Sequence, residues 1–407
     1  MKRLMSSRAI SAKQKIALSN ILMMCILFLL PHTSAAQEIS SPPVPKGPIS
    51  ETVIQGIELL YDLQFDRAEA LFSKVVAQRP KDPAGYFYLA MVTWSRLSSG
   101  FWLPEVVEEY GDRIDRVITV AKTKIANKED DCFTYFYLGG ALGFKARFEL
   151  MQRKWLSSYN LAYEAIKALK RCSEMAPTNK DFLLGLGIFD YYTARLSGVL
   201  KFLTYLFLHK GNKEEGLKKL QIVADEGTFS NIEAKSMLIH IYLFLEEDYQ
   251  KALPLTEELA TRFLNNPRHK FFEGVIHIRM GNASGYNEAL AYLRTRSRKE
   301  GSRLQAHIWG NQALYLEASY HLFRNEYDQA RSKLGVILLQ ADPSSDPNMV
   351  AWPLLKKGMS YDLEGNREKA LEYYNGILKM ENGAGAQFLA EKYINTPAQK
   401  GDPFLGY

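Results

Sequence analysis

Residues that could bind a metal or transfer a proton are scattered along this 407-residue sequence. Its seven histidines, among them His269 and His277, form no HExxH pair, and no GxSxG or phosphate-binding glycine loop is present. Two acidic runs, Asp130-Asp131 and Glu246 to Asp248, fit the starts of helices, where carboxylates are stabilised. The sequence therefore predicts no catalytic residue, no metal site and no cofactor, and it favours a protein that is not an enzyme.

The charge of the chain gives little indication of a partner. Residues 1–36 hold five of the 51 basic residues and none of the 45 acids, so the formal charge of +6 falls to +1 without them. A nearly neutral chain does not indicate nucleic acid. The run RTRSRK at Arg294 to Lys299 is the one notable basic cluster. It is typical of a solvated turn, and the alternative is a patch for an anionic ligand.

The first 36 residues predict a signal peptide. A basic start is followed by an apolar run from Ile16 to Leu30, and Ser34-Ala35-Ala36 precedes a cleavage position at Gln37. The run is about 15 residues, short of the ~20 that a spanning helix needs. We expect an exported chain, periplasmic or secreted; the alternative is an inner-membrane protein anchored by an uncleaved signal. Residues 37–49, rich in proline, predict an extended linker.

The stretch Leu354 to Met380 predicts a helical hairpin. Gly358 is the small residue of a first apolar face, and Gly365-Asn366 interrupts the run. Ala370 and Tyr374 then follow at helical spacing on a second face. Small residues at Gly358 and Ala370 let the two backbones approach, and Tyr374 fills the space beside them.

This spacing resembles the tetratricopeptide repeat, whose unit is about 34 residues. Similar patterns recur along the chain, with a longer third unit whose helices are each expected to be extended. The resemblance implies an all-α superhelical solenoid of about eight hairpins over residues 50–394, ending in a capping helix. Residues 395–407 are expected to form an extended tail. Such hairpins bury their apolar faces only by stacking on neighbours.

The same resemblance implies a concave groove that binds a protein or peptide. Carried over position by position, it is lined by apolar and aromatic residues, namely Phe87, Met91, Trp94, Phe136, Tyr191, Met237, Phe271, Tyr315 and Met359. Exposed aromatic and Met side chains would be suitable anchors for a protein partner. The alternative is that these residues belong to the core.

The fourth unit contains a dense apolar insert. Residues 183–222 resemble the corresponding segment of the tetratricopeptide repeat protein 39 family, which is regarded as one of interaction proteins. The insert, Leu196 to His209, is too apolar for one solvated helix face. It is either buried or an exposed patch for a partner or a membrane surface. Its large apolar side chains include Leu200, Phe202, Leu203, Tyr205 and Phe207.

The two cysteines outside the leader, Cys132 and Cys172, are expected at facing ends of one hairpin. An even number of cysteines in an exported chain favours a disulfide. The alternative is two buried free thiols.

Two classes of function follow from the sequence. The first is a non-enzymatic scaffold or adaptor that binds a protein or peptide. The second is an enzyme or small-ligand binder with a pocket near residues 196–216. Attachment to a membrane surface through the insert is compatible with the first.

Overall fold

The computed structural model describes residues 48–99, 102–195, 211–299, 301, 303–344 and 346–402, and every regular element there is helical. The predicted all-α class is confirmed. None of the described helices is long and apolar enough to cross a bilayer. The elements are α2 (Pro48–Tyr61), α3 (Phe65–Gln78), α4 (Pro83–Ser98), α5 (Pro104–Ala126), α6 (Cys132–Met151), α7 (Trp155–Met175), the 3-10 turn η1 (Lys180–Phe182), α8 (Leu183–Arg195), α10 (Lys213–Glu226), α11 (Asn231–Phe244), α12 (Tyr249–Arg262), α13 (Pro267–Arg279), α14 (Ala283–Lys299), α15 (Arg303–Phe323), α16 (Tyr327–Gln340), α17 (Asn348–Glu364), α18 (Arg367–Leu378) and α19 (Ala386–Asn395).

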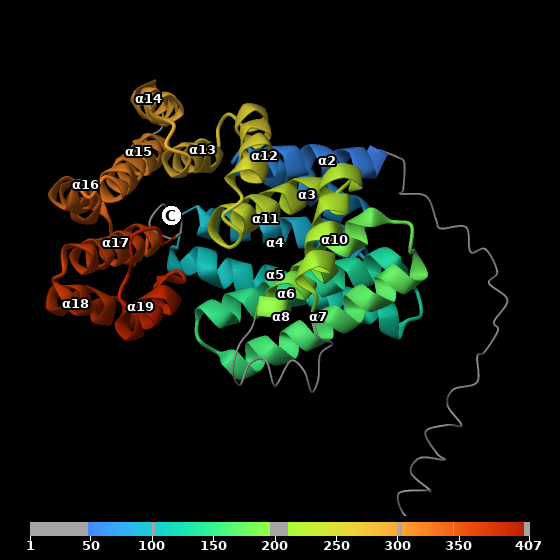
Figure 1. Ribbon diagram of the computed structural model, residues 1–407. Coiled ribbons are helices and arrows are strands. Elements are labelled where there is room, and N and C mark those ends of the chain that lie inside the picture. The colour runs from blue at the N-terminus through green and yellow to red at the C-terminus, as the bar shows by residue number, and fades with distance from the viewer. Residues whose placement is uncertain are drawn as a thin grey trace, which may run out of the picture. The chain divides into compact units, whose positions relative to one another are not determined.

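These helices pair in chain order into eight hairpins followed by one capping helix (Figure 1). The hairpins are α2/α3, α4/α5, α6/α7, α8/α10, α11/α12, α13/α14, α15/α16 and α17/α18, and α19 packs on the last of them. Each second helix also packs on the first helix of the next hairpin. The described part of the chain is therefore the solenoid of about eight hairpins that the sequence predicts.

Within the first four hairpins and within the last three, the first helices of neighbouring hairpins pack on one another and form the inner layer. α2 packs on α4, α4 on α6, and α6 on α8, and the same holds for α13, α15 and α17. No comparable packing joins the second helices of neighbouring hairpins in the described residues. The second helices therefore form the outer layer.

The last hairpin shows how local sequence sets the turn. Gly365 ends α17 with φ 89°, a left-handed conformation that glycine adopts without strain. The Asn366 side chain then accepts a hydrogen bond from the Lys369 backbone N–H and starts α18. Gly358 lies against the ring of Tyr374, as the spacing predicts.

Both helices of the third hairpin are longer than those of the first. α6 has 20 residues and α7 has 21, against 14 in each helix of the first hairpin. The predicted lengthening is confirmed. Asp131 caps α6 by accepting from the Thr134 N–H at 2.8 Å, and Asp248 caps α12. The acidic runs at these positions are therefore helix starts, as expected.

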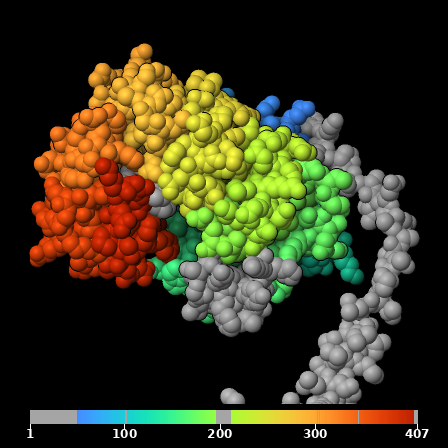
Figure 2. Space-filling model, in the orientation of Figure 1, coloured from blue at the N-terminus to red at the C-terminus, as the bar shows by residue number. Residues whose placement is uncertain are grey.

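The first hairpin is held against the fifth hairpin and the start of the sixth. Arg262 Nε donates to Glu58 at 3.0 Å, and Asn266 Nδ2 donates to the Tyr61 carbonyl at 2.9 Å. The Tyr61 ring also packs on Phe263, with centroids 5.9 Å apart. Figure 1 shows α2 beside α12, and in Figure 2 the blue surface lies next to the yellow. These contacts close a turn of the solenoid.

Candidate functional site

Seven of the nine predicted groove residues are buried. They are Phe87, Met91, Phe136, Tyr191, Phe271, Tyr315 and Met359. Trp94 is half-buried under the guanidinium of Arg147, 5.3 Å from its ring centroid, and Met237 is half-buried beside Tyr192. The expectation of an exposed aromatic groove at the seven positions is corrected, because these side chains belong to the core.

The reason is that aromatic rings from successive hairpins fill the inner face. Phe136 packs on Phe182 with ring centroids 5.3 Å apart. Phe133 contacts both Phe182, at 5.3 Å, and Phe229, at 6.1 Å. These rings come from the third and fourth hairpins and from the loop before the fifth. This packing places the predicted groove residue Phe136 in the core.

The predicted apolar insert, with Leu200, Phe202, Leu203, Tyr205 and Phe207, lies outside the described residues.

The residues on either side of it are anchored by one carboxylate. Glu246 pairs with Arg195 at 3.1 Å and with Lys213 at 2.8 Å, and it accepts from the Tyr191 hydroxyl at 2.5 Å. Partial burial opposes ionisation, but these donors lower the pKa of Glu246. The sequence alone predicts only a helix start or turn at Glu246, and no role in holding these residues together.

The chain end forms a cluster with three cations, which we call the tail cradle: Arg279, Lys356 and Lys392. Arg279 Nη1 donates to the carbonyl of Asp402, and Nη2 donates to that of Gly401, both at 3.2 Å. Lys392 Nζ lies 3.2 Å from the Asp402 carboxylate. The cradle thus holds both the backbone and the side chain of one short segment.

Lys356 is the buried member of the tail cradle, at 1% exposure. Burial holds the pKa of its amine well below the ordinary value; Asp402 opposes that shift and Arg279 adds to it. Its Nζ lies 5.9 Å from the ring centroid of Tyr315. Because a buried amine is stabilised by a neighbouring carboxylate, Asp402 makes this arrangement less costly.

A second set of contacts holds the end of α19 and the first residues beyond it. Arg367 donates to the carbonyls of Tyr393 and Ile394, both at 2.7 Å. Asp362 accepts from the Ala398 N–H at 2.9 Å. The predicted extended tail is therefore non-helical after Asn395, and through residue 402 it lies along the last hairpins.

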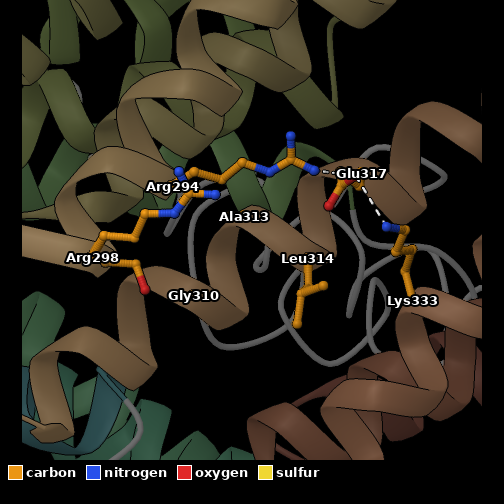
Figure 3. Close-up of a pocket in the computed structure, with 8 residues that line it drawn as sticks. Arg294, Arg298, Gly310, Ala313, Leu314, Glu317 and Lys333 are labelled. Carbon is orange, nitrogen blue, oxygen red and sulfur yellow. Dashed lines mark ion pairs between the residues drawn. The ribbon is translucent and has the colours of Figure 1, made fainter.

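A separate pocket of about 300 Å³ lies between α14, α15 and α16 (Figure 3). Arg294 and Lys333 both point to Glu317, at 2.6 and 3.2 Å, and Glu317 is only 8% exposed. Arg298 has no ion-pair partner among the described residues. Arg296 instead lies 5.1 Å from the Trp309 ring centroid. The basic run is thus partly neutralised inside the protein.

The histidines make no metal centre in the described residues. His269 and His277 are buried on one face of α13, and Glu273 lies between them at helical spacing. Glu273 accepts from Lys270 at 2.6 Å. Burial lowers the pKa of His269 to about 3. The imidazole is therefore neutral at physiological pH.

The two cysteines are free and buried, so the predicted disulfide between Cys132 and Cys172 is absent from this structure. Cys172 Sγ lies 3.1 Å from the Leu169 carbonyl. Burial raises the pKa of both thiols. The helix ends do bring the two residues into one core cluster, but each thiol serves there as a small apolar group.

Comparison with known proteins adds little. No family model and no curated protein sequence matches the chain. It is similar to a solved structure described as the crystal structure of the P58(IPK) TPR domain, with 14% identity, 86% of this chain and 90% of that chain covered, and a TM-score of 0.23. At this TM-score the similarity supports no conclusion about the fold or function of the chain. The resemblance to the tetratricopeptide repeat protein 39 family stays a prediction, and the helical-repeat fold rests on the eight hairpins.

Proposed function

We propose that this chain is an exported, non-enzymatic scaffold that binds a protein or peptide through its helical repeats. The observation that carries the proposal is the bound tail. Arg279 and Asp362 hold a non-helical segment through its backbone C=O and N–H groups. Side chains that contact peptide backbone can hold segments of different sequence.

The C-terminal hairpins are the half of the solenoid suited to a partner. Aromatic rings such as Phe133 and Phe229 pack together on the inner face of the first five hairpins, and the first hairpin is held against the fifth. The inner helices α13 and α17 instead contact a segment from the chain end. A partner segment of similar chemistry therefore fits α13, α17 and α19 better than the filled inner face.

Site-specific photo-crosslinking tests this proposal. A photoreactive amino acid replaces Glu391, which is exposed on α19 next to Lys392 of the tail cradle, and in a matched control it replaces exposed Lys74 on α3. We expect a discrete adduct in envelope extract from position 391 only. No adduct, or equal adducts from both positions, would count against a scaffold that acts through its C-terminal hairpins.

The export part of the proposal has a separate test. The leader predicts that the recovered chain begins at Gln37. Fractionation of the source cells, with mass determination of the recovered chain, measures both location and cleavage. A chain that retains residues 1–36 in the inner-membrane fraction would favour the anchored alternative.

A further inference from the structure

The tip of the tail has a defined conformation. The Asp402 N–H donates to the Gln399 carbonyl at 3.1 Å, and Gly401 has φ 90°. Gln399 and Asp402 are therefore the first and fourth residues of a turn, and Gly401 is the third. A left-handed third residue is the pattern of a type II β-turn, which favours glycine at that position. The turn directs the carbonyls of Gly401 and Asp402 to one guanidinium.

Arg279 is held in place independently of the tail. Its Nε donates to the Tyr249 hydroxyl at 2.7 Å, its Nη2 pairs with Glu247 at 2.6 Å, and the guanidinium lies 4.9 Å from the Phe323 ring centroid. A side chain already fixed in its bound conformation loses little entropy when a ligand arrives. The cation is thus preorganised for a pair of carbonyl groups.

The acidic side chain of the turn is recognised separately. The Asp402 carboxylate contacts Lys392 and stabilises the charged form of Lys356. The cradle comes from α13, α17 and α19, whereas the turn follows the last helix of the repeat domain. Since the two are joined only by residues 396–398, an equivalent turn from another chain can make the same contacts.

We propose that the tail cradle is a recognition site for a Gly–Asp turn in an extended segment of a protein partner, and that residues 399–402 of the chain occupy it in the free protein. The proposal rests on the proposed scaffold function and specifies the partner's chemistry. Arg279 contacts the two carbonyls of the turn, and Lys392 contacts its carboxylate. A partner segment must displace the tail.

Displacement has a predictable size. A tethered segment competes at an effective concentration in the millimolar range. For a free peptide with a dissociation constant of roughly 10–100 µM, such competition weakens apparent binding by about 10- to 100-fold. Release of the resident tail should therefore strengthen binding of the free peptide by a similar factor.

The test uses the full mature chain and a fluorescein-labelled peptide of residues 396–407. Fluorescence anisotropy should show little binding of the peptide to the wild-type chain. The peptide should bind at least tenfold more tightly to Asp402→Ala, because the tail of this variant binds its own cradle more weakly. Asp225→Ala, an exposed acid on α10, is the matched control and should behave as wild type. A peptide with alanine at the Asp402 position should bind the Asp402→Ala chain at least tenfold more weakly.

A second variant keeps the test decisive if Asp402→Ala does not fold. The Lys392 side chain is 49% exposed, so Lys392→Ala should fold, and it weakens the resident tail and the peptide alike. We expect measurable peptide exchange, weaker than with Asp402→Ala. If peptide binding to wild type, Asp402→Ala and Lys392→Ala is equal or absent in chains with unchanged circular dichroism, the tail is a fixed part of the fold and the proposal is wrong. Tail exchange without any crosslinked partner would instead overturn only the scaffold function.

Discussion

Adding one methyl group at Gly358 tests the packing rule on which the repeat prediction depends. A Cβ at this position would lie 2.5 Å from Cε1 and 2.9 Å from Cδ1 of Tyr374. Ordinary carbon contacts are about 3.5–4.0 Å. Tyr374 is fully buried, its hydroxyl donates to Asp362 at 2.8 Å, and its ring packs on Tyr393. The ring therefore has no free direction in which to move.

The expected cost follows from two opposing effects. Overpacking a tight core costs about 1–3 kcal/mol. Replacing glycine by alanine inside a helix contributes about 1 kcal/mol of stability. Gly358→Ala should therefore lose about 1 kcal/mol of unfolding free energy. Gly376, exposed on α18 with nothing within 4 Å of a built Cβ, is the matched control, and Gly376→Ala should gain about 1 kcal/mol.

Urea unfolding followed by circular dichroism and Trp fluorescence measures both variants. Two probes are needed because neighbouring repeats can unfold separately, and Trp352 on α17 reports on the affected hairpin. The two variants should differ by about 2 kcal/mol. If Gly358→Ala is as stable as Gly376→Ala, close approach of the two helices at Gly358 is refuted.

Three further predictions concern pH, thiols and closure of the solenoid. Burial lowers the pKa of His240 to about 4, so between about pH 6.5 and pH 4 the unfolded chain binds a proton that the folded chain does not, and the free energy of unfolding decreases as the pH is lowered. Urea titrations at pH 7, 6 and 5 should show that His240→Gln removes up to about 1.4 kcal/mol per pH unit of this slope. An unchanged slope would contradict the burial of His240. Because burial raises the pKa of Cys132 and Cys172, a thiol reagent at pH 8 should detect no reactive thiol in the native mature chain. After unfolding without reductant it should detect two. If it detects none after unfolding, the two cysteines form a disulfide and the assignment of free thiols is wrong. Tyr61→Phe removes the hydroxyl that donates to Glu233 and should lower the free energy of unfolding by about 1 kcal/mol. Amide hydrogen exchange should then become faster in α2 and α11 together. Faster exchange in α2 alone would argue against closure of the solenoid by the first and fifth hairpins.

The sequence predicts the local architecture well because each hairpin is encoded within a short window. Gly358, Gly365 and Tyr374 identify the last hairpin without reference to distant residues. The longer third hairpin could be predicted for the same reason, since an insertion at the tip of a hairpin extends both helices. The apolar positions were also assigned correctly as apolar faces. What spacing could not decide was whether Phe136 or Tyr191 faces a groove or a core.

That decision depends on contacts between residues far apart in sequence. Glu58 and Arg262 lie on the first and fifth hairpins, and no local spacing links them. The tail cradle has the same property, because Arg279 and Asp402 are separated by more than 100 residues. The one local signal was the Gly401-Asp402 pair before a proline, a typical turn sequence, and it predicts the turn but not the cations around it.

Closure of the solenoid and docking of the tail have opposite consequences for binding. Aromatic rings such as Phe133 and Phe229, from the third hairpin and the loop before the fifth, pack together in the core. In the last hairpins and the capping helix, the charged groups of Arg279 and Lys392 contact the tail. A filled apolar core cannot exchange its contents without unfolding, whereas a charged cradle can exchange one turn for another of the same chemistry. Recognition is therefore expected at Arg279 and Lys392, whereas the sequence alone predicted an apolar groove.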